Sequence, residues 1–563
     1  MVNPSQPRLR VGLLLDGFYQ PRWIARIVEK LVSSHCVDLS LVVLNDPPAS
    51  PRPSLTRARS WIRNRHYLLY AIYRQLDRLW FKVPNDPFVL SDLTSQLNAV
   101  PVARVRPRMT KHCDYFEQAD VETLLAYDLD VAVRFGFRIL KGDALRIARY
   151  GVWSYHHGDN HVNRGGPAGF WEVMQDADVT GTILQRLTED LDNGQVLYRS
   201  SSPTNRFSVA KNQSDVFWSS TTVLPRVLED LHRHGPAAFE EHASRSSWHG
   251  YSDRLYVVPK NAEMARLLIR LARRYIVERV RGTVAFDQWF VAFRTRREAP
   301  AGQFVPDSGY YRFTKLIPPP DRFWADPFVA EHEGRRFIFV EEFLYQANRG
   351  RVSVFEIDAA GTASGPVPVL ERDYHLSYPF VFEWDGTHYM IPETHATRQI
   401  ELFRAERFPH EWVFDRVLIP DVRAVDATLA HIDGLWWLFA SVASSPEMPW
   451  SDLWLFYART PLGPWTAHQR NPVKSDTRTA RPAGRPFEWR GKLYRPAQDC
   501  SRRYGHSIVI NEIQRIDPAE FWETEVSRIT PKWTEGLLAT HTINASNTVT
   551  VIDGLRSRLG RPR

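Results

Sequence analysis

The chain has 563 residues, of which 43% are hydrophobic and 24% charged, and this ordinary globular composition excludes wholesale disorder. Its length suits roughly two to four domains, at about 150 residues per domain. The net charge of +8 favours phosphate-bearing ligands or an anionic membrane surface, and because we find no RNP, zinc-finger or bZIP pattern, we do not expect nucleic acid as a partner.

The first elements along the chain predict a parallel sheet. Two continuous apolar runs, at 10–17 and 37–46, flank a stretch at 22–32 whose apolar residues recur at helical spacing. A buried strand, an amphipathic helix and a second buried strand are typical of a βαβ unit. Residues 55–82 then predict a long arginine-rich helix, and residues 120–140 predict another helix followed by a buried strand. We therefore expect an α/β domain over residues 1–205.

Two features bear on the compartment. The apolar run "VGLLLDGF" is too short for a signal sequence or a membrane span, and no later run has 18 apolar residues in succession. The three cysteines, at positions 36, 113 and 500, have no metal-ligand spacing and form no even set for disulfides. The sequence thus predicts a cytoplasmic protein, soluble or peripheral to a membrane.

Residues 151–173, "GVWSYHHGDNHVNRGGPAGFWEV", combine three histidines, an aspartate, two asparagines and a Gly-Gly-Pro between apolar ends. Together with "VRFGFRIL" before it and "DVTGTILQRLTEDLDNGQVL" after it, this segment resembles the folate-dependent formyltransferase family. The resemblance covers roughly residues 10–205. It implies a Rossmann-like fold and transfer of a formyl or related acyl group from 10-formyltetrahydrofolate to an amino group.

The resemblance also implies roles for particular residues. It places the catalytic histidine at His156 and the catalytic aspartate at Asp192, while the family's asparagine is replaced by Ser154. Attack of an amine on a formyl carbonyl builds an oxyanion, which a histidine and an amide donor stabilise. A serine hydroxyl reaches less far than an asparagine amide, so the change predicts an altered donor or rate. The implied cofactor-binding residues are Phe137, Arg138, Ile139 and Leu140, with Arg164, Gly165, Gly166 and Pro167 as a loop.

Three further polar residues in this segment, His157, Asp159 and His161, have no counterpart in the family. They either line the acceptor pocket or fill the space that the asparagine leaves. A metal site formed by His156, His157 and His161 is the alternative. Because no carboxylate stands at helical spacing from them, we predict no metal.

Residues 206–304 predict a mainly helical, basic connector that includes "MARLLIRLARRYIVERVRG". A helix of this kind has either one packed and one solvated face or a face that contacts a membrane or partner.

From residue 305 the pattern changes to short strands, and a repeat emerges around hairpin glycines. These glycines are Gly334, Gly386, Gly434 and Gly491, and a partial last copy ends at Gly554. Each copy reads as two strands around an Asp-Gly or Glu-Gly hairpin turn. Repeats of about 50 residues are typical of propeller blades, so five copies predict an all-β five-bladed β-propeller over residues 305–563.

This half resembles the family 43 glycoside hydrolases and, more closely, the propeller-like domain of plant glucosamine inositolphosphorylceramide transferases. The resemblance places the hydrolases' base at Asp326 in "WADPF" and their tuning aspartate at Asp426 in "AVDATL". Where their acid stands in Glu-Gly-Pro, this chain has Ala483, Gly484 and Arg485. Glycoside hydrolysis needs a protonated carboxyl group, which Glu342, Glu393 or Asp499 would have to supply from another position.

Two other residues complete the expected propeller site. Arg485 in the place of an acid indicates an anionic ligand such as a phosphate or uronate. The resemblance places at His541 an axial histidine that holds a metal through water in some relatives. The alternative is that these polar residues only hydrogen-bond to one another at the blade axis.

Three functions follow. The first is formyl transfer to the amino group of a sugar or of a nucleotide- or lipid-linked sugar, with the propeller binding the carbohydrate acceptor. The second is a carbohydrate-binding or glycosyl-transfer accessory protein of glycolipid biosynthesis with a degenerate formyltransferase domain. The third is a propeller glycosidase with a displaced acid. The partners are a small-molecule donor and a sugar-containing acceptor, and the sequence leaves the oligomeric state open.

Overall fold

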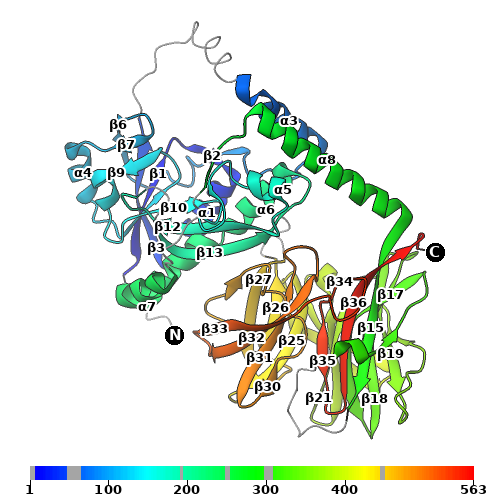
Figure 1. Ribbon diagram of the computed structural model, residues 1–563. Coiled ribbons are helices and arrows are strands. Elements are labelled where there is room, and N and C mark those ends of the chain that lie inside the picture. Colours follow the sequence, from blue (N-terminus) through cyan, green and yellow to red (C-terminus); the bar gives the residue numbers. More distant parts are fainter. Residues whose placement is uncertain are drawn as a thin grey trace. The chain divides into compact units, whose positions relative to one another are not determined.

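The computed structural model describes residues 7–46, 65–190, 194–246, 254–296, 309–443 and 450–562. The chain divides into two compact units, residues 1–273 (unit 1) and 274–563 (unit 2), which Figure 1 colours from blue to green and from green to red. None of the helices in the described ranges combines the length and apolarity needed to cross a membrane.

Unit 1 is built on a seven-stranded sheet in the order β13-β12-β10-β8-β1-β3-β5. Five of these strands, β1, β3, β5, β8 and β10, run parallel to one another. The other two, β12 and β13, are antiparallel and lie at one edge of the sheet. The strands are β1 (Leu9–Leu15), β3 (Val37–Asn45), β5 (Val102–Val105), β8 (Val131–Arg134), β10 (Val152–His156), β12 (Val179–Arg186) and β13 (Gln195–Pro203). The predicted strand–helix–strand start and the α/β class are confirmed.

Helices cover both faces of this sheet, because alternate side chains of each strand point to opposite sides. Leu13 and Leu15 of β1 pack with α1 (Arg22–Val32) and α7 (Val223–Ser246), whereas Leu14 packs with α4 (Gln118–Leu125). α7 is interrupted at Gly235, whose φ is 74°. The other helices are α3 (Leu68–Trp80), α5 (Phe170–Gln175), α6 (Val209–Ser220) and α8 (Asn261–Val284). Of the predicted helix at 55–82, residues 55–64 lie outside the described residues.

Small elements decorate this sheet. Paired short strands are β2 (Tyr19–Pro21) with β4 (Leu90–Asp92), β6 (Arg108–Met109) with β7 (Cys113–Tyr115) and β9 (Ile139–Lys141), and β11 (Arg164–Gly165) with β14 (Leu255–Tyr256). Single 3-10 turns in the chain are Arg65–Tyr67, Gly142–Arg146, Tyr310–Arg312 and His395–Thr397.

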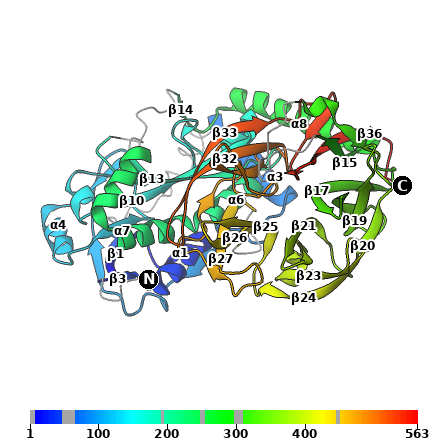
Figure 2. The same ribbon diagram turned by 90° about the horizontal axis from the view of Figure 1, so that it is seen from below.

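Unit 2 contains five antiparallel sheets, which confirms the predicted five blades (Figure 2). Successive inner strands pack against one another, β17 on β21 and β21 on β25. The first four blades are β17 (Arg322–His332) to β20 (Val367–Leu370), β21 (Ser377–Trp384) to β24 (Glu411–Ile419), β25 (Ala424–Ile432) to β29 (Lys474–Ser475), and β30 (Phe487–Trp489) to β33 (Phe521–Ile529). Between them lie β18 (Arg335–Leu344), β19 (Arg349–Ile357), β22 (Thr387–Glu393), β23 (Ile400–Arg407), β26 (Leu435–Val442), β27 (Asp452–Ala458), β28 (Thr466–Ala467), β31 (Lys492–Asp499) and β32 (Ser507–Ile516).

The four predicted hairpin turns lie where the repeat placed them. In each, the glycine and the residue before it both have positive φ, for example 50° at Glu333 and 73° at Gly334. Two successive positive φ values define a type I′ turn, whose twist matches that of the flanking strands. Glycine at the second position removes the steric cost that any other residue would carry there.

The fifth blade combines strands from both ends of unit 2. β15 (Ala285–Thr295) pairs along its whole length with β36 (Val549–Leu559), and β16 (Thr314–Leu316), β34 (Leu537–Ala539) and β35 (Ile543–Ala545) complete the sheet. Two expectations are therefore corrected. The expected connector at 206–304 is not separate, because α6 and α7 pack in unit 1 and β15 is a blade strand. Gly554 lies inside β36 and not in a turn.

Candidate functional site

Three blades of unit 2 share one backbone irregularity at the start of the inner strand. Asp326, Tyr378 and Asp426 have φ values of 50°, 47° and 56°, and the pairing register shifts beside each of them. A left-handed residue other than glycine costs of the order of 1 kcal/mol or more, and such strain concentrates at functional sites. The repeated bulge therefore marks a candidate site, which we call the axial cluster: Asp326, Glu341, Glu393, Asp426, Arg481 and His541.

One side of the axial cluster is a chain of buried charges. His541 lies with Nε2 3.0 Å from Oδ1 of Asp326 and Nδ1 2.9 Å from Oδ2 of Asp553. Although burial alone would lower the pKa of His541, the two carboxylates raise it well above 6.5. Burial would raise the pKa of Asp326, but the charge and hydrogen bond of His541 hold it below 3.8. The histidine is therefore an imidazolium between two carboxylates.

The other side is centred on Asp426. This carboxylate accepts hydrogen bonds from the guanidinium of Arg481 and from Nε2 of Gln498, the latter at 2.9 Å. Burial raises the pKa of Asp426 to about 7 against the opposing charge of Arg481. Arg481 also lies 4.8 Å from the ring centroid of Tyr504. Asp426 is thus a carboxyl group that changes charge near neutral pH.

Two glutamates from neighbouring blades complete the cluster. Glu341 and Glu393 hold equivalent positions, because they pair with Ala325 and Ser377 beside the two bulges. Burial and the charges of Asp326 and Glu393 raise the pKa of Glu341 well above 4.5. Glu393 lies 2.8 Å from Nδ1 of His395 and 3.9 Å from Arg481. The axial cluster thus combines the carboxyl groups of Asp326, Glu341, Glu393 and Asp426 with the side chains of Arg481 and His541.

The structure places three expected site residues elsewhere. Glu342 follows Glu341 in β18 and points to the opposite face of the strand, away from the cluster. Arg322 and Arg351 each donate a hydrogen bond to it at 2.9 Å. Burial would raise the pKa of Glu342, but these bonds lower it. Asp499 binds Arg528, and the guanidinium of Arg485 lies 4.5 Å from the ring centroid of Phe380. Each of these three side chains thus has a partner within unit 2 and lies outside the axial cluster.

Glu341 and Arg481 were missed from the sequence. In "FVEEF" the strand period of two puts only one of the adjacent glutamates toward the axis, and the bulge at Asp326 decides which one. Arg481 stands four residues before Arg485 in "ARPAGRPF", and either could be aligned with the absent acid. The signal for Glu341 was the matching glutamate of the next blade, Glu393.

Within the described part of the chain, one group of side chains could together hold a metal ion. It consists of Asp326, His541 and Asp553. Both ring nitrogens of His541 already face a carboxylate. A metal would have to displace the imidazolium proton, so the arrangement fits a proton-held network better than a cation site.

Unit 1 gathers polar side chains where its parallel strands end. Asp16 follows β1, Asn45 ends β3, Arg134 ends β8, and Ser154 and His156 lie in β10. Asn45 donates to Asp16 at 2.8 Å, and Asp16 also accepts from the backbone N–H of Phe137 at 2.8 Å. The carboxyl ends of parallel strands are where α/β folds bind ligands.

Ser154 is bonded to an arginine on the neighbouring strand. Arg134, its register partner in β8, donates to the Ser154 hydroxyl from Nε at 3.1 Å and from Nη2 at 2.9 Å. Burial lowers the pKa of Arg134. The Arg134 guanidinium thus occupies the Ser154 hydroxyl, two residues before His156 in β10. Arg134 was not singled out from the sequence.

The segment 137–140, which the resemblance assigns to folate binding, uses its polar side chain in hydrogen bonds within unit 1. Phe137 and Leu140 are buried, and Arg138 donates to Asp114 from both its backbone and its side chain. Its other nitrogens bond to the carbonyl groups of Thr110 and Cys113. Arg138 and Ile139 are partly exposed. These contacts hold the loop in place, and the folate donor that the resemblance implies stays a prediction.

The remaining expected residues of unit 1 are dispersed. His157 is half-buried, stacks on Phe217 with ring centroids 3.6 Å apart, and has its pKa lowered to about 3 by burial. Asp159 lies 3.6 Å from Arg199 and accepts from the backbone N–H of His161 at 3.0 Å. His157 therefore packs against the aromatic side chain of Phe217, and Asp159 stabilises the loop that contains His161.

Two other expectations concern the loop and the aspartate. Arg164 and Gly165 form β11, where a Cβ at position 165 would approach the Tyr256 carbonyl oxygen to 2.3 Å. Glycine is therefore required by the pairing with β14. Asp192 lies outside the described residues.

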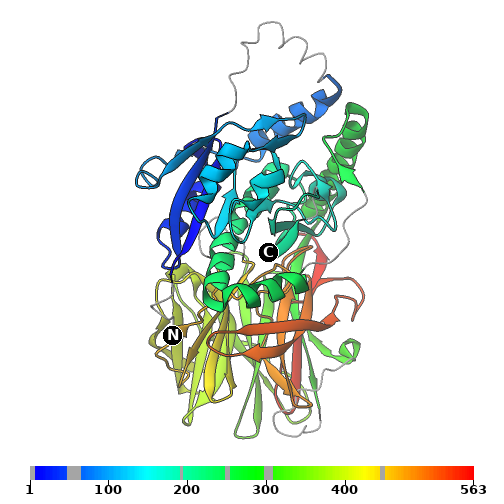
Figure 3. The same cartoon turned by 90° about the vertical axis from the view of Figure 1, so that its left-hand side faces the viewer.

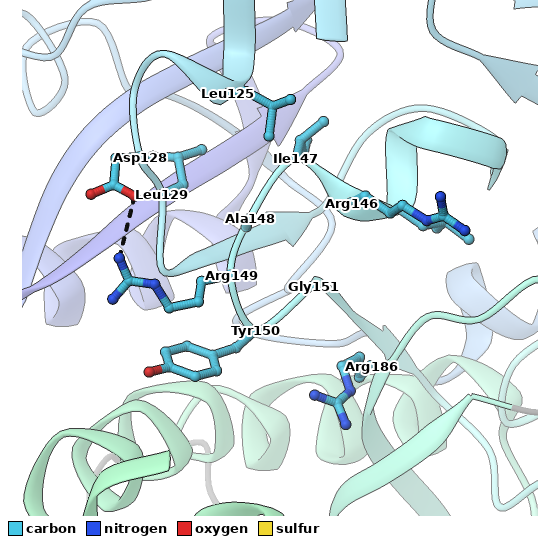
Figure 4. Close-up of a pocket in the computed structure, with 11 residues that line it drawn as sticks. Leu125, Asp128, Leu129, Arg146, Ile147, Ala148, Arg149, Tyr150, Gly151 and Arg186 are labelled. Atoms are coloured by element: carbon cyan, nitrogen blue, oxygen red, sulfur yellow. Dashed lines mark hydrogen bonds and ion pairs between the residues drawn. The ribbon is translucent and has the colours of Figure 1, made fainter. Parts of the chain in front are cut away.

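A separate cavity of about 520 Å³ lies at the opposite, amino end of β10 (Figure 4). Arg146, Arg149 and Arg186 line it. Arg149 lies 3.3 Å from Asp128 and 3.2 Å from Asp130, and Arg186 is 2.6 Å from Glu240. Its arginines are thus engaged in ion pairs within the unit.

Comparison with known proteins concerns mainly unit 2. Residues 315–545 match the family described as glucosamine inositolphosphorylceramide transferase 1, N-terminal. The transferase of that name from Oryza sativa subsp. japonica is 37% identical over 212 residues, and the one from Arabidopsis thaliana is 33% identical over 211. Each match covers 37% of this chain and 28% of the relative, so the chain spans little more than a quarter of these relatives.

Solved structures show weaker likeness. Zg3597, a family 117 glycoside hydrolase of Zobellia galactanivorans, has 12% identity and a TM-score of 0.31, over 47% of this chain and 90% of its own. The glycinamide ribonucleotide transformylase 1 of Symbiobacterium toebii has 13% identity and a TM-score of 0.27, over 40% and 89%. Scores of this size carry no argument about function.

Proposed function

We propose that unit 2 binds the sugar-bearing headgroup of a glycolipid at the axial cluster, and that the chain serves glycosyl transfer in glycolipid biosynthesis. The similarity of residues 315–545 to glucosamine inositolphosphorylceramide transferases supports this assignment. The observation that carries it is the axial cluster itself, whose six residues all lie inside the matched region.

The chemistry of the axial cluster suits an amino sugar attached to a phosphate. Carboxylate side chains such as those of Asp326 and Glu393 accept hydrogen bonds from hydroxyl and ammonium groups, while Arg481 donates to anionic oxygen atoms. Glycosyl transfer also requires a base for the acceptor hydroxyl and an acid for the leaving oxygen. Asp426, with its pKa raised to about 7, and Glu341, with its pKa raised well above 4.5, are matched to those roles.

Calorimetric titration of the full chain tests this proposal. The probes are glucosamine, inositol phosphate and a glucosaminyl inositol phosphate, with glucose as the sugar that lacks both charges. We expect the conjugate to bind best and Glu341→Gln or Asp426→Asn to weaken it at least about tenfold, the effect of one lost charged hydrogen bond. Glu411→Gln, an exposed glutamate of the same unit, is the matched control. Equal binding by all four proteins would refute the site.

Hydrolysis distinguishes the glycosidase alternative. That function predicts release of the chromophore from a chromogenic pentoside, abolished by Asp326→Asn. We expect no release, because His541 and Thr542 already occupy the Asp326 carboxylate.

For unit 1 we propose a group-transfer site around His156, Ser154 and Arg134, in which the guanidinium supplies the charge stabilisation lost with the asparagine. The resemblance names 10-formyltetrahydrofolate as the donor to test first. Titration with the stable analogue 5-formyltetrahydrofolate, with Asp192→Ala as a comparison, decides it. Micromolar binding would support formyl transfer to an amino sugar, whereas no binding by folded protein would exclude this donor.

A further inference from the structure

Helix α3 of unit 1 exposes a stripe of large apolar side chains. Leu68, Ile72, Leu76, Leu79 and Trp80 are 45%, 45%, 57%, 66% and 76% exposed. Their spacing of three or four residues puts them on one face of the helix. The opposite face carries Tyr73 and Asp77, which are buried. Isolated exposed leucines are ordinary, but a continuous stripe of five marks an interaction surface.

Helix α8 begins beside α3 and adds positive charge (Figures 1 and 3). The side chain of Asn261 accepts from the backbone N–H of Leu69 at 3.1 Å and donates to the carbonyl group of Arg65 at 2.8 Å. Met264 and Leu267 pack with Tyr73 in one hydrophobic cluster. These contacts fix the start of α8 against the inner side of α3.

The outward residues of this part of α8 are mainly basic. Arg266, Arg270 and Arg273 are exposed, and Ile269 between them is 70% exposed. Lys82, just beyond the end of α3, is exposed and adds positive charge. We give the name amphipathic patch to the α3 stripe together with Arg266, Ile269, Arg270 and Arg273 of α8 and with Lys82.

Apolar side chains flanked by arginines are the composition of helices that lie in a membrane interface. Leucine and isoleucine enter the boundary between headgroups and acyl chains, tryptophan prefers that boundary, and arginine pairs with anionic lipid headgroups. A soluble protein partner would not require arginines beside the apolar stripe, whereas an anionic bilayer is complementary to the arginines of α8 and to the stripe of α3. The chain as a whole carries a net charge of +8, which adds to this attraction.

We propose that α3 and the first three turns of α8 dock unit 1 on an anionic phospholipid bilayer, with the α3 stripe inserted and the arginines of α8 on the headgroups. This binding is peripheral and independent of the function proposed for the axial cluster. It accounts for the exposure of the five apolar side chains of α3.

Cosedimentation of the full chain with vesicles tests the proposal. We expect strong binding to phosphatidylcholine vesicles that contain phosphatidylserine and weak binding to phosphatidylcholine alone. Because the Debye length falls from about 10 Å at 0.1 M salt to about 3 Å at 1 M, salt should weaken the binding. The double variant Leu76→Glu/Leu79→Glu should lower the partition coefficient at least about tenfold, since two apolar contacts are lost and two negative charges approach the lipid.

Controls separate docking from misfolding. Leu125→Glu changes a 50% exposed leucine on α4, away from the patch, and should bind as wild type does. Because Leu76 and Leu79 are exposed, their variant should keep the circular dichroism and unfolding temperature of wild type. Arg266→Glu/Arg270→Glu should reduce binding to anionic vesicles and flatten its salt dependence.

Three results would overturn the proposal. One is no binding to anionic vesicles by the folded wild-type chain. Another is equal binding by the Leu76→Glu/Leu79→Glu variant. The third is a wild-type dimer in solution that this variant converts to a monomer without any change in vesicle binding, because a second copy of the chain would then cover the stripe.

Discussion

Replacing His541 with alanine should destabilise unit 2 severely. The imidazole is 1% exposed, and the carboxylates of Asp326 and Asp553 on either side of it are 4% and 0% exposed. The variant leaves both carboxylates buried without their cation. Removing one partner of a buried ion pair typically costs about 3–5 kcal/mol. For a unit of this size that corresponds to a fall of about 10 °C in the unfolding temperature.

Differential scanning calorimetry of the full chain measures the effect, because it separates transitions of the two units. His410→Ala, an exposed histidine of the same unit, is the control and should change the unfolding temperature little. Adding Asp553→Asn to His541→Ala removes one of the uncompensated charges and should restore part of the loss. A fall below about 2 °C, or no recovery in the double variant, would refute the buried-charge argument.

The contributions of His541 and Asp326 to the stability of unit 2 should depend on pH in opposite directions. The folded-state pKa of His541 is raised above 6.5, so its contribution to stability is complete below pH 6.5 and is lost as pH rises through the folded-state value. The pKa of Asp326 is lowered below 3.8, so its contribution is present above pH 3.8 and is lost as pH falls through the folded-state value. The gap in stability between wild type and His541→Ala should therefore narrow in alkaline solution. A gap that stays constant there would contradict a charged His541.

Other predictions concern single residues. The Asp426 carboxyl group should titrate near pH 7, which carbon-13 NMR of aspartate carboxyl groups should show as a step that is missing from Asp426→Asn. Gly484→Ala should lower the unfolding temperature of unit 2, because the new Cβ would lie 2.0 Å from the carbonyl oxygen of Ile543 and φ there is 138°; unchanged calorimetry would contradict this contact. Ser154→Ala should cost unit 1 about 1–3 kcal/mol in chemical denaturation, because two donors of Arg134 lose their acceptor, whereas Ser33→Ala, at an exposed helix end, should have almost no effect.

The sequence predicted the blade hairpins well because their signal is local. A type I′ turn needs glycine at one position and alternating strands on either side, and both are visible without knowledge of distant residues. The ring closure was missed because it depends on a pairing between β15 and β36, which lie at opposite ends of unit 2. The stretch at 285–295 follows directly on a helix, so the helical pattern around it concealed a strand.

The candidate site was predictable only in part, for a related reason. Asp326 and Asp426 could be found from their short motifs, but the choice between Glu341 and Glu342 depends on a bulge that shifts the strand register. A shift of one residue exchanges the two faces of a strand. Arg134 was missed because its role follows from its pairing with Ser154 on a strand twenty residues away.

The pairing of β15 with β36 has a consequence for biosynthesis. The partner of the first blade strand follows it only after the other four blades, so the ring has a high contact order and stays open until β36 has been translated. Until then β15 presents an unpaired edge, to which the β36 strand of a second nascent chain has the right sequence to bind. The order of synthesis thus makes strand exchange between chains the characteristic misfolding hazard of this propeller.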